Sequence, residues 1–275
     1  MGDTLTIVQD GTGVTRKMGC LRPIPEKTRR FKALRAVVPD LPRASWQEVD
    51  FTSLLGDVWD QGNYGSCTGH GCGKAIEVAL RIMGVTIPSG GLSPTSLYSL
   101  VNGGRDDGAI VSDCLIALIN TGIGLMAQVP ESQIFERQIS SIAKANYSRF
   151  RAISAYHCNS FDAMVTALQL GYPVAFGISL VNAFMGTIPA SGIVPFKGMY
   201  VGGHCMFAYG CTEINNIWYL KVQNSWGSDW ANGGRCLMGE EHFQGDDLDA
   251  FCIQTTALDP QDPIVLPTLN LASAN

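Results

Sequence analysis

The chain is poor in charged residues: Asp, Glu, Lys and Arg make up 16% of its 275 residues, against roughly 25% in an average soluble domain. This low charge, together with 46% hydrophobic residues, excludes a disordered, highly charged chain, which could not bury enough apolar surface to fold. The formal net charge of −5 argues against a general phosphate-binding surface. No nucleic-acid partner is therefore predicted.

Long hydrophobic runs are also missing. The longest apolar stretch, residues 173–189, is interrupted by two glycines and an asparagine, whereas a membrane span needs about 20 largely apolar residues. We interpret it as buried strand and predict no membrane partner. The first ten residues carry Asp3 and Asp10 and lack the apolar centre of a secretory signal. The predicted location is therefore cytoplasmic or associated with a virus particle.

Cysteine is abundant, but no two cysteines form a CxxC pair. Disulfide scaffolds are normally small secreted chains, so most of the nine cysteines are predicted to be buried, reduced side chains. A metal site built from Cys67, His70 and Cys72 is not expected, because residues five apart on a helix point about 140° away from each other. The sequence predicts no metal and no cofactor.

The chain changes period from helical to strand-like along its length. Three segments repeat apolar residues at the three- and four-residue spacing of a buried helix face, and they lie over residues 72–83, 110–120 and 161–171. Short strand-like runs between Gly and Asn turns lie over residues 173–180, 204–210 and 217–224. Helices first and strands later indicate an α+β protein with two lobes rather than an alternating βαβ sheet.

The two ends of the chain differ from this pattern. Residues 1–40 are rich in turn formers and charges and show no sustained periodicity, so we interpret them as an N-terminal arm wrapped on the surface. Residues 259–275 are Pro-rich and polar, which predicts a loosely held C-terminal tail.

The most informative segment is Asp60-Gln-Gly-Asn-Tyr-Gly-Ser-Cys67, which leads straight into the first predicted helix. A thiol is a good nucleophile only as the thiolate, and the positive end of a helix dipole favours that form. Gly62 and Gly65 allow the chain to turn sharply before Cys67, and their small size leaves room for a substrate backbone. The amide of Gln61 and the Cys67 backbone N–H would together form an oxyanion hole.

A nucleophilic cysteine needs an imidazole, and the chain has four histidines. His204 follows two glycines and opens an apolar strand, where its side chain would face a cleft. His70, three residues after Cys67, is the one rival base. Its helical position aims it poorly for proton transfer, so we interpret it as cleft lining. His157 and His242 lie in polar, turn-like contexts and are predicted to be surface residues.

The imidazole needs a group that orients it. Asn224 follows His204 by twenty residues and ends a predicted strand. An Asn carbonyl can accept the imidazole N–H and fix its tautomer, as a carboxylate does in serine enzymes. Trp226 would cover that bond and keep water away from it.

These motifs resemble those of the papain-like cysteine peptidases, and the bacterial-type members most of all. The order Cys, His, Asn is that of the family, and the likeness covers about residues 41–258. The matching stretches are Gln61-Gly62, Gly65-Ser66-Cys67, Gly202-Gly203-His204 and Asn224-Ser225-Trp226-Gly227, followed by Trp230 and Gly233.

The resemblance implies a thiol protease, a hydrolase that acts on protein or peptide substrates. Cys67 would be the nucleophile, His204 the general base and acid, Asn224 the orienting residue and Gln61 the oxyanion donor, with Trp226 in support. The implied fold is α+β and papain-like. A helical left lobe, about residues 41–150, would face an antiparallel β-barrel right lobe, about residues 151–258, across the active-site cleft.

The same resemblance places Gly108 and Gly203 against the substrate, although an ordinary turn glycine explains Gly108 equally well. Thr68 stands where the family has an aromatic residue, and Tyr64 where secreted members have a cysteine. Three alternating glycines follow in the helix, at a cost of roughly 1 kcal/mol each. The long helical pro-region is absent, and residues 1–40 would cross the cleft as a short plug in its place.

Two other functions remain open. A papain-fold protein that no longer cuts would serve as a structural or binding module of a larger assembly, while a transferase or amidase would use the same side chains differently. Retention of all four catalytic residue types favours the peptidase. A phosphate loop over Gly69–Lys74 is excluded, because Thr68 and Ala75 stand where it needs Gly and a hydroxyl.

Overall fold

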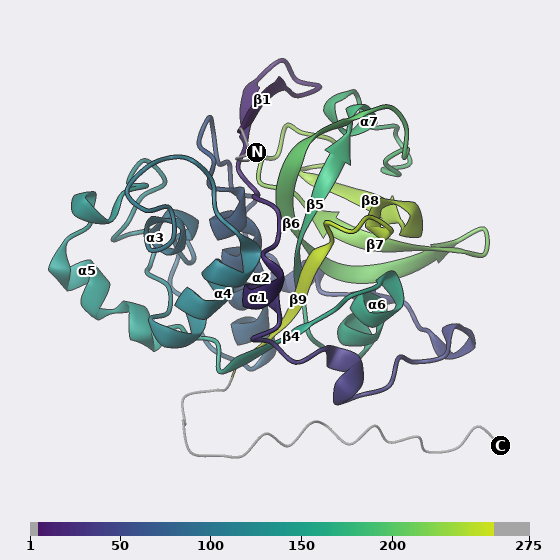
Figure 1. Cartoon of the computed structure of the whole chain (residues 1–275), viewed down its shortest axis with the longest axis horizontal. Coiled ribbons are helices and arrows are strands. Elements are labelled where there is room, and N and C mark those ends of the chain that lie inside the picture. The colour runs from purple at the N-terminus through teal and green to yellow at the C-terminus, as the bar shows by residue number, and fades with distance from the viewer. Residues whose placement is uncertain (1–4, 256–275) are drawn as a thin grey trace.

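The computed structural model describes residues 5–255, and Figure 1 shows a helical part on the left beside a sheet on the right. The helical part contains α2 (Cys67–Ile82), α3 (Pro94–Ser99), α4 (Val111–Asn120) and α5 (Ser141–Ala145). The other helices are α1 (Pro25–Thr28), α6 (Phe161–Gln169) and α7 (Asn182–Met185). Short 3₁₀ turns lie at Leu34–Ala36, Arg43–Ser45, Thr52–Leu54, Glu136–Gln138, Tyr147–Arg149 and Glu240–Phe243.

The strands form one antiparallel sheet and one separate hairpin. The hairpin pairs β1 (Thr6–Gln9) with β2 (Thr15–Met18). The sheet runs in the order β4-β9-β5-β6-β7-β8, with β3 paired to β6. Its strands are β3 (Val49–Asp50), β4 (Ser154–His157), β5 (Val174–Val181), β6 (Tyr200–Ile214), β7 (Ile217–Gln223), β8 (Arg235–Gly239) and β9 (Asp249–Gln254).

Within residues 5–255 this sheet is open, so the closed β-barrel implied by the resemblance is wrong in that detail. The two outer strands, β4 and β8, pair with connecting segments instead of with each other. Ala33 bridges to His157 of β4, and Ile193 bridges to Leu237 of β8. These bridges satisfy backbone groups at the sheet edges, which closure would otherwise have to pair.

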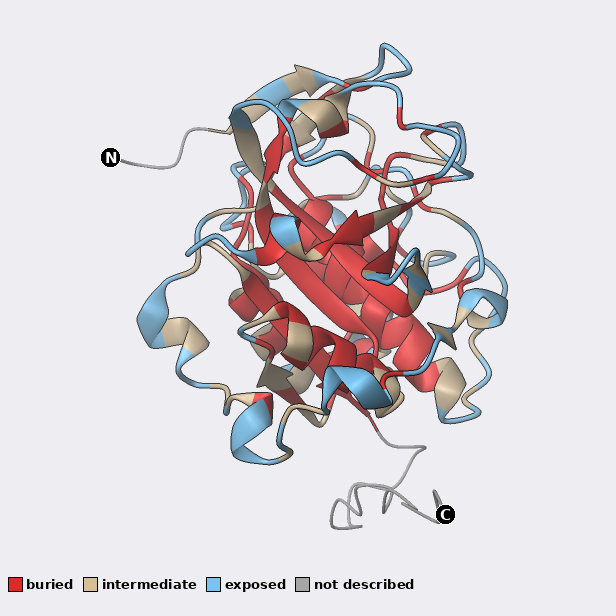
Figure 2. Ribbon diagram, turned by 90° about the vertical axis from the view of Figure 1, so that its right-hand side faces the viewer, coloured by how far each residue is buried: buried red, intermediate tan, exposed pale blue. Residues whose placement is uncertain are grey.

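Two hydrophobic cores hold the molecule together, and Figure 2 shows them as a red band of buried helix and strand through its centre. One core lies between the sheet and α6 and includes Phe176 and Leu220. The other joins α2 and α4 to the sheet and includes Ile76 and Phe207. The predicted α+β class, with a helical part and a sheet part, is therefore confirmed.

Helix α2 is buried over the whole stretch Cys67–Leu80, and its glycines explain how. A Cβ on Gly71 would lie 2.6 Å from the Cys205 sulfur and 2.9 Å from the Met206 carbonyl oxygen. A Cβ on Gly69 would lie 2.9 Å from the Tyr98 Cβ. These two glycines let α2 lie directly against β6 and α3. The close packing offsets the low helix propensity of glycine.

The local predictions from periodicity are confirmed. All three predicted helices are present, and Ser160 caps α6 by accepting a hydrogen bond from the Ala163 N–H. Strands β5, β6 and β7 cover the predicted runs. All nine cysteines lie within residues 5–255 and are free thiols. No helix among residues 5–255 is long and apolar enough to cross a membrane.

The N-terminal arm, residues 5–40, does not stay on the surface as predicted. Arg16 and Met18 are buried, at 2% and 1% exposure. The chain after β2 pairs with both parts of the molecule: the Ala109 N–H donates to the Gly19 carbonyl, and the Cys20 N–H donates to the Gly203 carbonyl. The predicted tail, residues 259–275, lies outside the described residues.

Candidate active site

Cys67 is the first residue of α2 and is fully buried. The backbone of Cys205, next to His204, and the backbone of Gly19 in the arm lie close enough to the Cys67 thiol to lower its pKa. Burial raises the pKa of this thiol to about 12, although those backbone contacts act in the opposite direction. With the arm in place, desolvation therefore outweighs the favourable end of the helix dipole, and the thiol keeps its proton.

His204 and Asn224 form a buried pair. Nε2 of His204 lies 2.7 Å from Oδ1 of Asn224, which also accepts the Ser225 N–H at 2.8 Å. Because an amide oxygen can only accept, Nε2 carries the proton and Nδ1 keeps its lone pair. Nδ1 is buried without a hydrogen-bond partner. Burial lowers the pKa of His204 to about 4 against the opposing effect of Asn224, so the ring is neutral at pH 7.

An aromatic cluster covers this pair. The ring of Trp226 lies 5.0 Å from the ring of His204, between centroids, and 5.4 Å from that of Phe184. Trp230 stacks on Phe184 at 4.9 Å. Both tryptophans are 1% exposed. The structure thus places Trp226 over the imidazole, where its bulk excludes water from the bond to Asn224.

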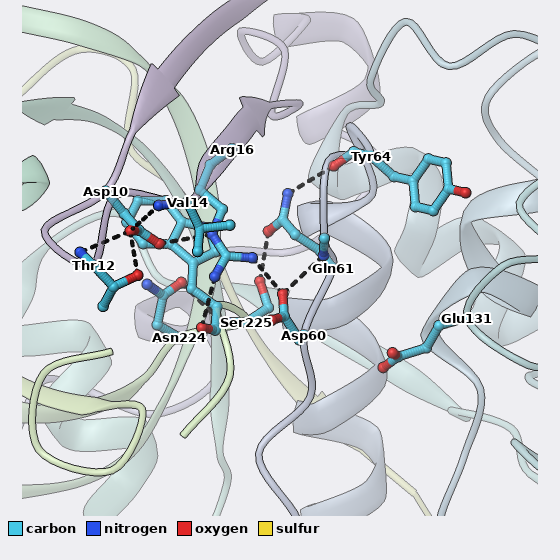
Figure 3. A network of polar contacts seen from close by, with 12 residues as sticks. Asp10, Thr12, Val14, Arg16, Asp60, Gln61, Tyr64, Glu131, Asn224 and Ser225 are labelled. Carbon is cyan, nitrogen blue, oxygen red and sulfur yellow. Dashed lines mark hydrogen bonds and ion pairs between the residues drawn. The ribbon is translucent and has the colours of Figure 1, made fainter. Parts of the chain in front are cut away.

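Gln61 is fixed by bonds to three neighbours. Its Nε2 donates to the carbonyl oxygens of Tyr64 at 2.8 Å and Lys17 at 3.1 Å. Its Oε1 accepts from the Ser225 hydroxyl at 2.7 Å, and its backbone N–H donates to the Ser225 carbonyl. Figure 3 shows the Gln61 side chain between Tyr64 and Ser225. The amide that would stabilise an oxyanion therefore faces a carbonyl oxygen of the arm.

Gly108 and Gly203 both touch the arm's backbone. A Cβ on Gly108 would collide with the Gly19 carbonyl, and a Cβ on Gly203 would collide with the Cys20 carbonyl. The Leu21 N–H also donates to the Ala109 carbonyl at 2.9 Å. The two glycines predicted to face a substrate thus contact an extended segment of this same chain.

Arg16 fastens the arm to the site (Figure 3). Its guanidinium donates to Asp10 Oδ2 at 2.8 Å, to the Trp226 carbonyl at 2.9 Å and to Asp60 Oδ1. Asp10 in turn accepts hydrogen bonds from Thr12 and from the Val14 N–H. Since the arginine is 2% exposed and bonds at once to its own hairpin and to both parts of the molecule, it is a buried clamp.

Sequence reasoning missed Arg16. Burial alternates along β2, so that Arg16 and Met18 face inward, but four residues are too few to reveal a period. Nothing in the sequence tells which acid a buried arginine will meet.

Two other histidines are buried. His70 is 1% exposed, and its Nδ1 lies 2.9 Å from the Ser66 carbonyl oxygen. His242 is buried rather than on the surface, with Nε2 3.0 Å from the Val194 carbonyl oxygen. Polar neighbours in sequence predicted exposure here, and tertiary packing overrode them.

Comparison with known proteins defines the class. The model of the papain family of cysteine proteases matches residues 43–245. The chain therefore belongs to the papain family of cysteine proteases.

Individual relatives are more distant. The chain is 27% identical to mouse pro-cathepsin H over 226 residues, which is 74% of this chain and 62% of that protein. It is 25% identical to cysteine proteinase 3 of Entamoeba histolytica over 236 residues, 82% of this chain and 70% of that protein. The crystal structure of xylellain, a cysteine protease from Xylella fastidiosa, matches with a TM-score of 0.74 at 21% identity, covering 91% and 98% of the two chains. The last likeness is one of fold.

Proposed function

We propose that this protein is a peptidase that hydrolyses peptide bonds with Cys67 as nucleophile, His204 as general base and acid, and Asn224 as the orienting residue. The observation that carries the proposal is the 2.7 Å bond from His204 Nε2 to Asn224, which leaves Nδ1 as the basic nitrogen. The backbone of Cys205, the residue after His204, lies close enough to the Cys67 thiol to lower its pKa. Imidazole and thiol thus come from packed elements, β6 and α2.

The reaction follows from these placements. Nδ1 of His204 takes the thiol proton while the Cys67 sulfur attacks the substrate carbonyl carbon. The resulting oxyanion accepts hydrogen bonds from Gln61 Nε2 and the Cys67 N–H. The C–N bond then breaks, and His204 returns its proton to the leaving amine. Water attacks the thioester with His204 as base, which releases a carboxylic acid and restores the thiol.

The arm acts as an internal plug in this proposal. The Lys17 carbonyl takes the Gln61 donor, the Gly19 backbone contacts the Cys67 thiol, and Gly203 pairs with Cys20. These groups are the ones that a substrate backbone would need. Activity therefore requires that the arm leave the cleft.

The test uses the full chain opened by Gly19→Val, because any Cβ at Gly19 collides with the Gly65 backbone. Hydrolysis of a fluorogenic peptide library is expected in this variant. Adding Cys67→Ala or His204→Ala should lower kcat by more than about 10⁴-fold. Cys236→Ala, at a buried cysteine of β8 whose pKa is set by burial alone, is the matched control and should leave kcat unchanged.

An opened chain that hydrolyses no peptide, and whose nine cysteines react equally with iodoacetamide, would favour the non-cutting papain-fold module instead. Acyl transfer to an added amine without hydrolysis would point to the transferase.

A further inference from the structure

A small cavity adjoins the proposed site, between α2 and the sheet, and Asn224 is among its lining residues. Its lining includes Trp59, His70, Lys74, Phe207 and Gln223. The volume that the centre of a water molecule can occupy in this cavity is about 10 Å³. One buried water needs at least about 10 Å³ by the same measure. The cavity is therefore of the size of a single water.

Two buried acceptor atoms at this cavity, Nε2 of His70 and Oε1 of Gln223, have no hydrogen-bond partner, and neither has the donor Nδ2 of Asn224, which also lines it. The residues are 1% and 3% exposed, so bulk water does not reach them. An unsatisfied buried polar atom costs about 1–3 kcal/mol, and two acceptors at one cavity call for a shared partner.

The chemistry of the two atoms defines that partner. Nδ1 of His70 faces the Ser66 carbonyl at 2.9 Å, so Nδ1 carries the proton. Burial lowers the pKa of His70 to about 4, which keeps the ring neutral and leaves Nε2 as an acceptor. Gln223 Oε1 is an acceptor too. Two acceptors cannot bond to each other, but the two O–H groups of one water satisfy both.

The other polar groups at the cavity do not donate to His70, since Nδ2 of Asn224 has no hydrogen-bond partner at all. The Lys74 ammonium already donates to the Leu55 and Asp57 carbonyls and to Glu77. Oε1 of Glu131 lies 3.9 Å from His70 Nε2, which is beyond hydrogen-bond length. If the Gln223 amide were turned over, its Nε2 would donate to the same water and the bridge would remain.

The bridge would connect the two sides of the site. His70 holds the carbonyl of Ser66, the residue before Cys67, through both its ring and its backbone N–H. Gln223 is the last residue of β7 and precedes Asn224. The nucleophile and the orienting residue stand on different parts of the molecule, so their relative position depends on contacts across this interface.

We propose that His70 is a positioning residue that acts through one buried water shared with Gln223, aligning Cys67 with the His204–Asn224 pair. This inference rests on the proposed function, since the geometry that it fixes is that of the proposed triad. It assigns His70 a role other than proton transfer, and Gln223 a role in the same network.

The first test is a crystal structure of the full chain at high resolution. One ordered water is expected within about 3.2 Å of both His70 Nε2 and Gln223 Oε1. A dry cavity, or a direct contact between the two side chains, overturns the proposal whether or not the protein proves active.

The second test is a double-mutant cycle in the chain opened by Gly19→Val, with His70→Leu and Gln223→Met. Both changes remove a polar group at similar volume. Each is expected to lower kcat for peptide hydrolysis, and the rate of Cys67 alkylation at pH 6, about tenfold with little change in KM. The double variant should be no worse than the worse single one, because both break the same bridge.

His242→Leu is the matched control, a buried histidine that also has one bond to a backbone carbonyl. It should lower stability without changing kcat. His70→Gln, which retains an acceptor, should recover part of the loss. Multiplicative losses in the double variant, or unchanged rates in His70→Leu, overturn the proposal. If the opened parent chain itself shows neither hydrolysis nor selective alkylation, the proposed function fails, and the crystallographic water still decides the bridge.

Discussion

The two halves of the proposed site are both buried, but different parts of the chain cover them. His204 lies under Trp226 and Phe184, which belong to the same sheet part of the molecule. The Cys67 thiol instead contacts the backbone of Gly19, a residue of the arm. The cover of the imidazole is thus part of the sheet's own core, whereas that of the thiol is the backbone of the N-terminal arm, whose Met18 also packs in that core.

This difference explains an apparent conflict in the electrostatics. Burial raises the pKa of Cys67 and lowers that of His204, so both groups are neutral in the closed molecule. Removal of the arm would rehydrate the thiol side and leave the helix dipole and the Cys205 backbone to favour a thiolate. The imidazole would keep its aromatic cover. On the proposed function, we therefore expect that removing the arm from Cys67 is enough to activate the pair.

The largest effect is expected when the arm no longer covers the Cys67 thiol. Gly19→Val should expel the arm, and we expect Cys67 alkylation by iodoacetamide at pH 7 to rise about 100-fold. Mass mapping of the modified cysteine measures the rate. Gly186→Ala is the matched control, since a Cβ there would lie no closer than 3.6 Å to any atom. Equal rates in Gly19→Val and Gly186→Ala would show that the arm does not protect the thiol.

A smaller effect is expected when the Trp226 ring that covers the His204 imidazole is removed. Trp226→Leu removes the ring over His204 and admits water to the bond with Asn224. In the opened chain, kcat should fall about tenfold while KM changes little, because substrate contacts are untouched. The readout is the steady-state hydrolysis of the best library peptide. A change confined to KM would instead assign Trp226 to substrate binding.

The interaction of Arg16 with Asp10, which helps to hold the arm in place, should weaken at acidic pH. Burial raises the pKa of Asp10, but hydrogen bonds from Thr12, Arg16 and the backbone outweigh it, and the net pKa is below the usual 3.8. A lowered pKa means that the carboxylate stabilises the closed arm above about pH 4 and loses this effect as the pH falls further.

Hydrogen exchange of residues 10–21, corrected for intrinsic rates, should therefore be about three- to tenfold faster at pH 3 than at pH 6. Asp10→Asn should show the faster exchange at both pH values. A pH response that survives in Asp10→Asn would assign the effect to another group.

Most of the fold was predictable from the sequence, and so was the contact between His204 and Asn224. Periodicity predicted α4 and α6, because apolar residues of each helix pack in a single core. The position of the arm was not predictable, since it depends on Arg16 meeting Asp60 and on Gly19 meeting Gly65, which are far apart in sequence. The state of Cys67 was missed for the same reason: a helix start predicts a lowered thiol pKa, and only the tertiary cover raises it.

A different kind of effect, on stability rather than on rate, is expected at the contact that joins the two halves, where α2 lies on β6. Gly71→Ala would place a methyl group 2.9 Å from the Met206 carbonyl oxygen, which is backbone and cannot rotate away. Gly73→Ala would meet only the end of the Ile123 side chain, at 3.2 Å. Denaturant unfolding should show a loss of about 2 kcal/mol for Gly71→Ala, and little change or a slight gain for Gly73→Ala, where helix propensity improves. Equal losses in the two variants would mean that α2 is held by its own helical stability rather than by this close approach. The interface between nucleophile and imidazole would then be looser than the glycines indicate.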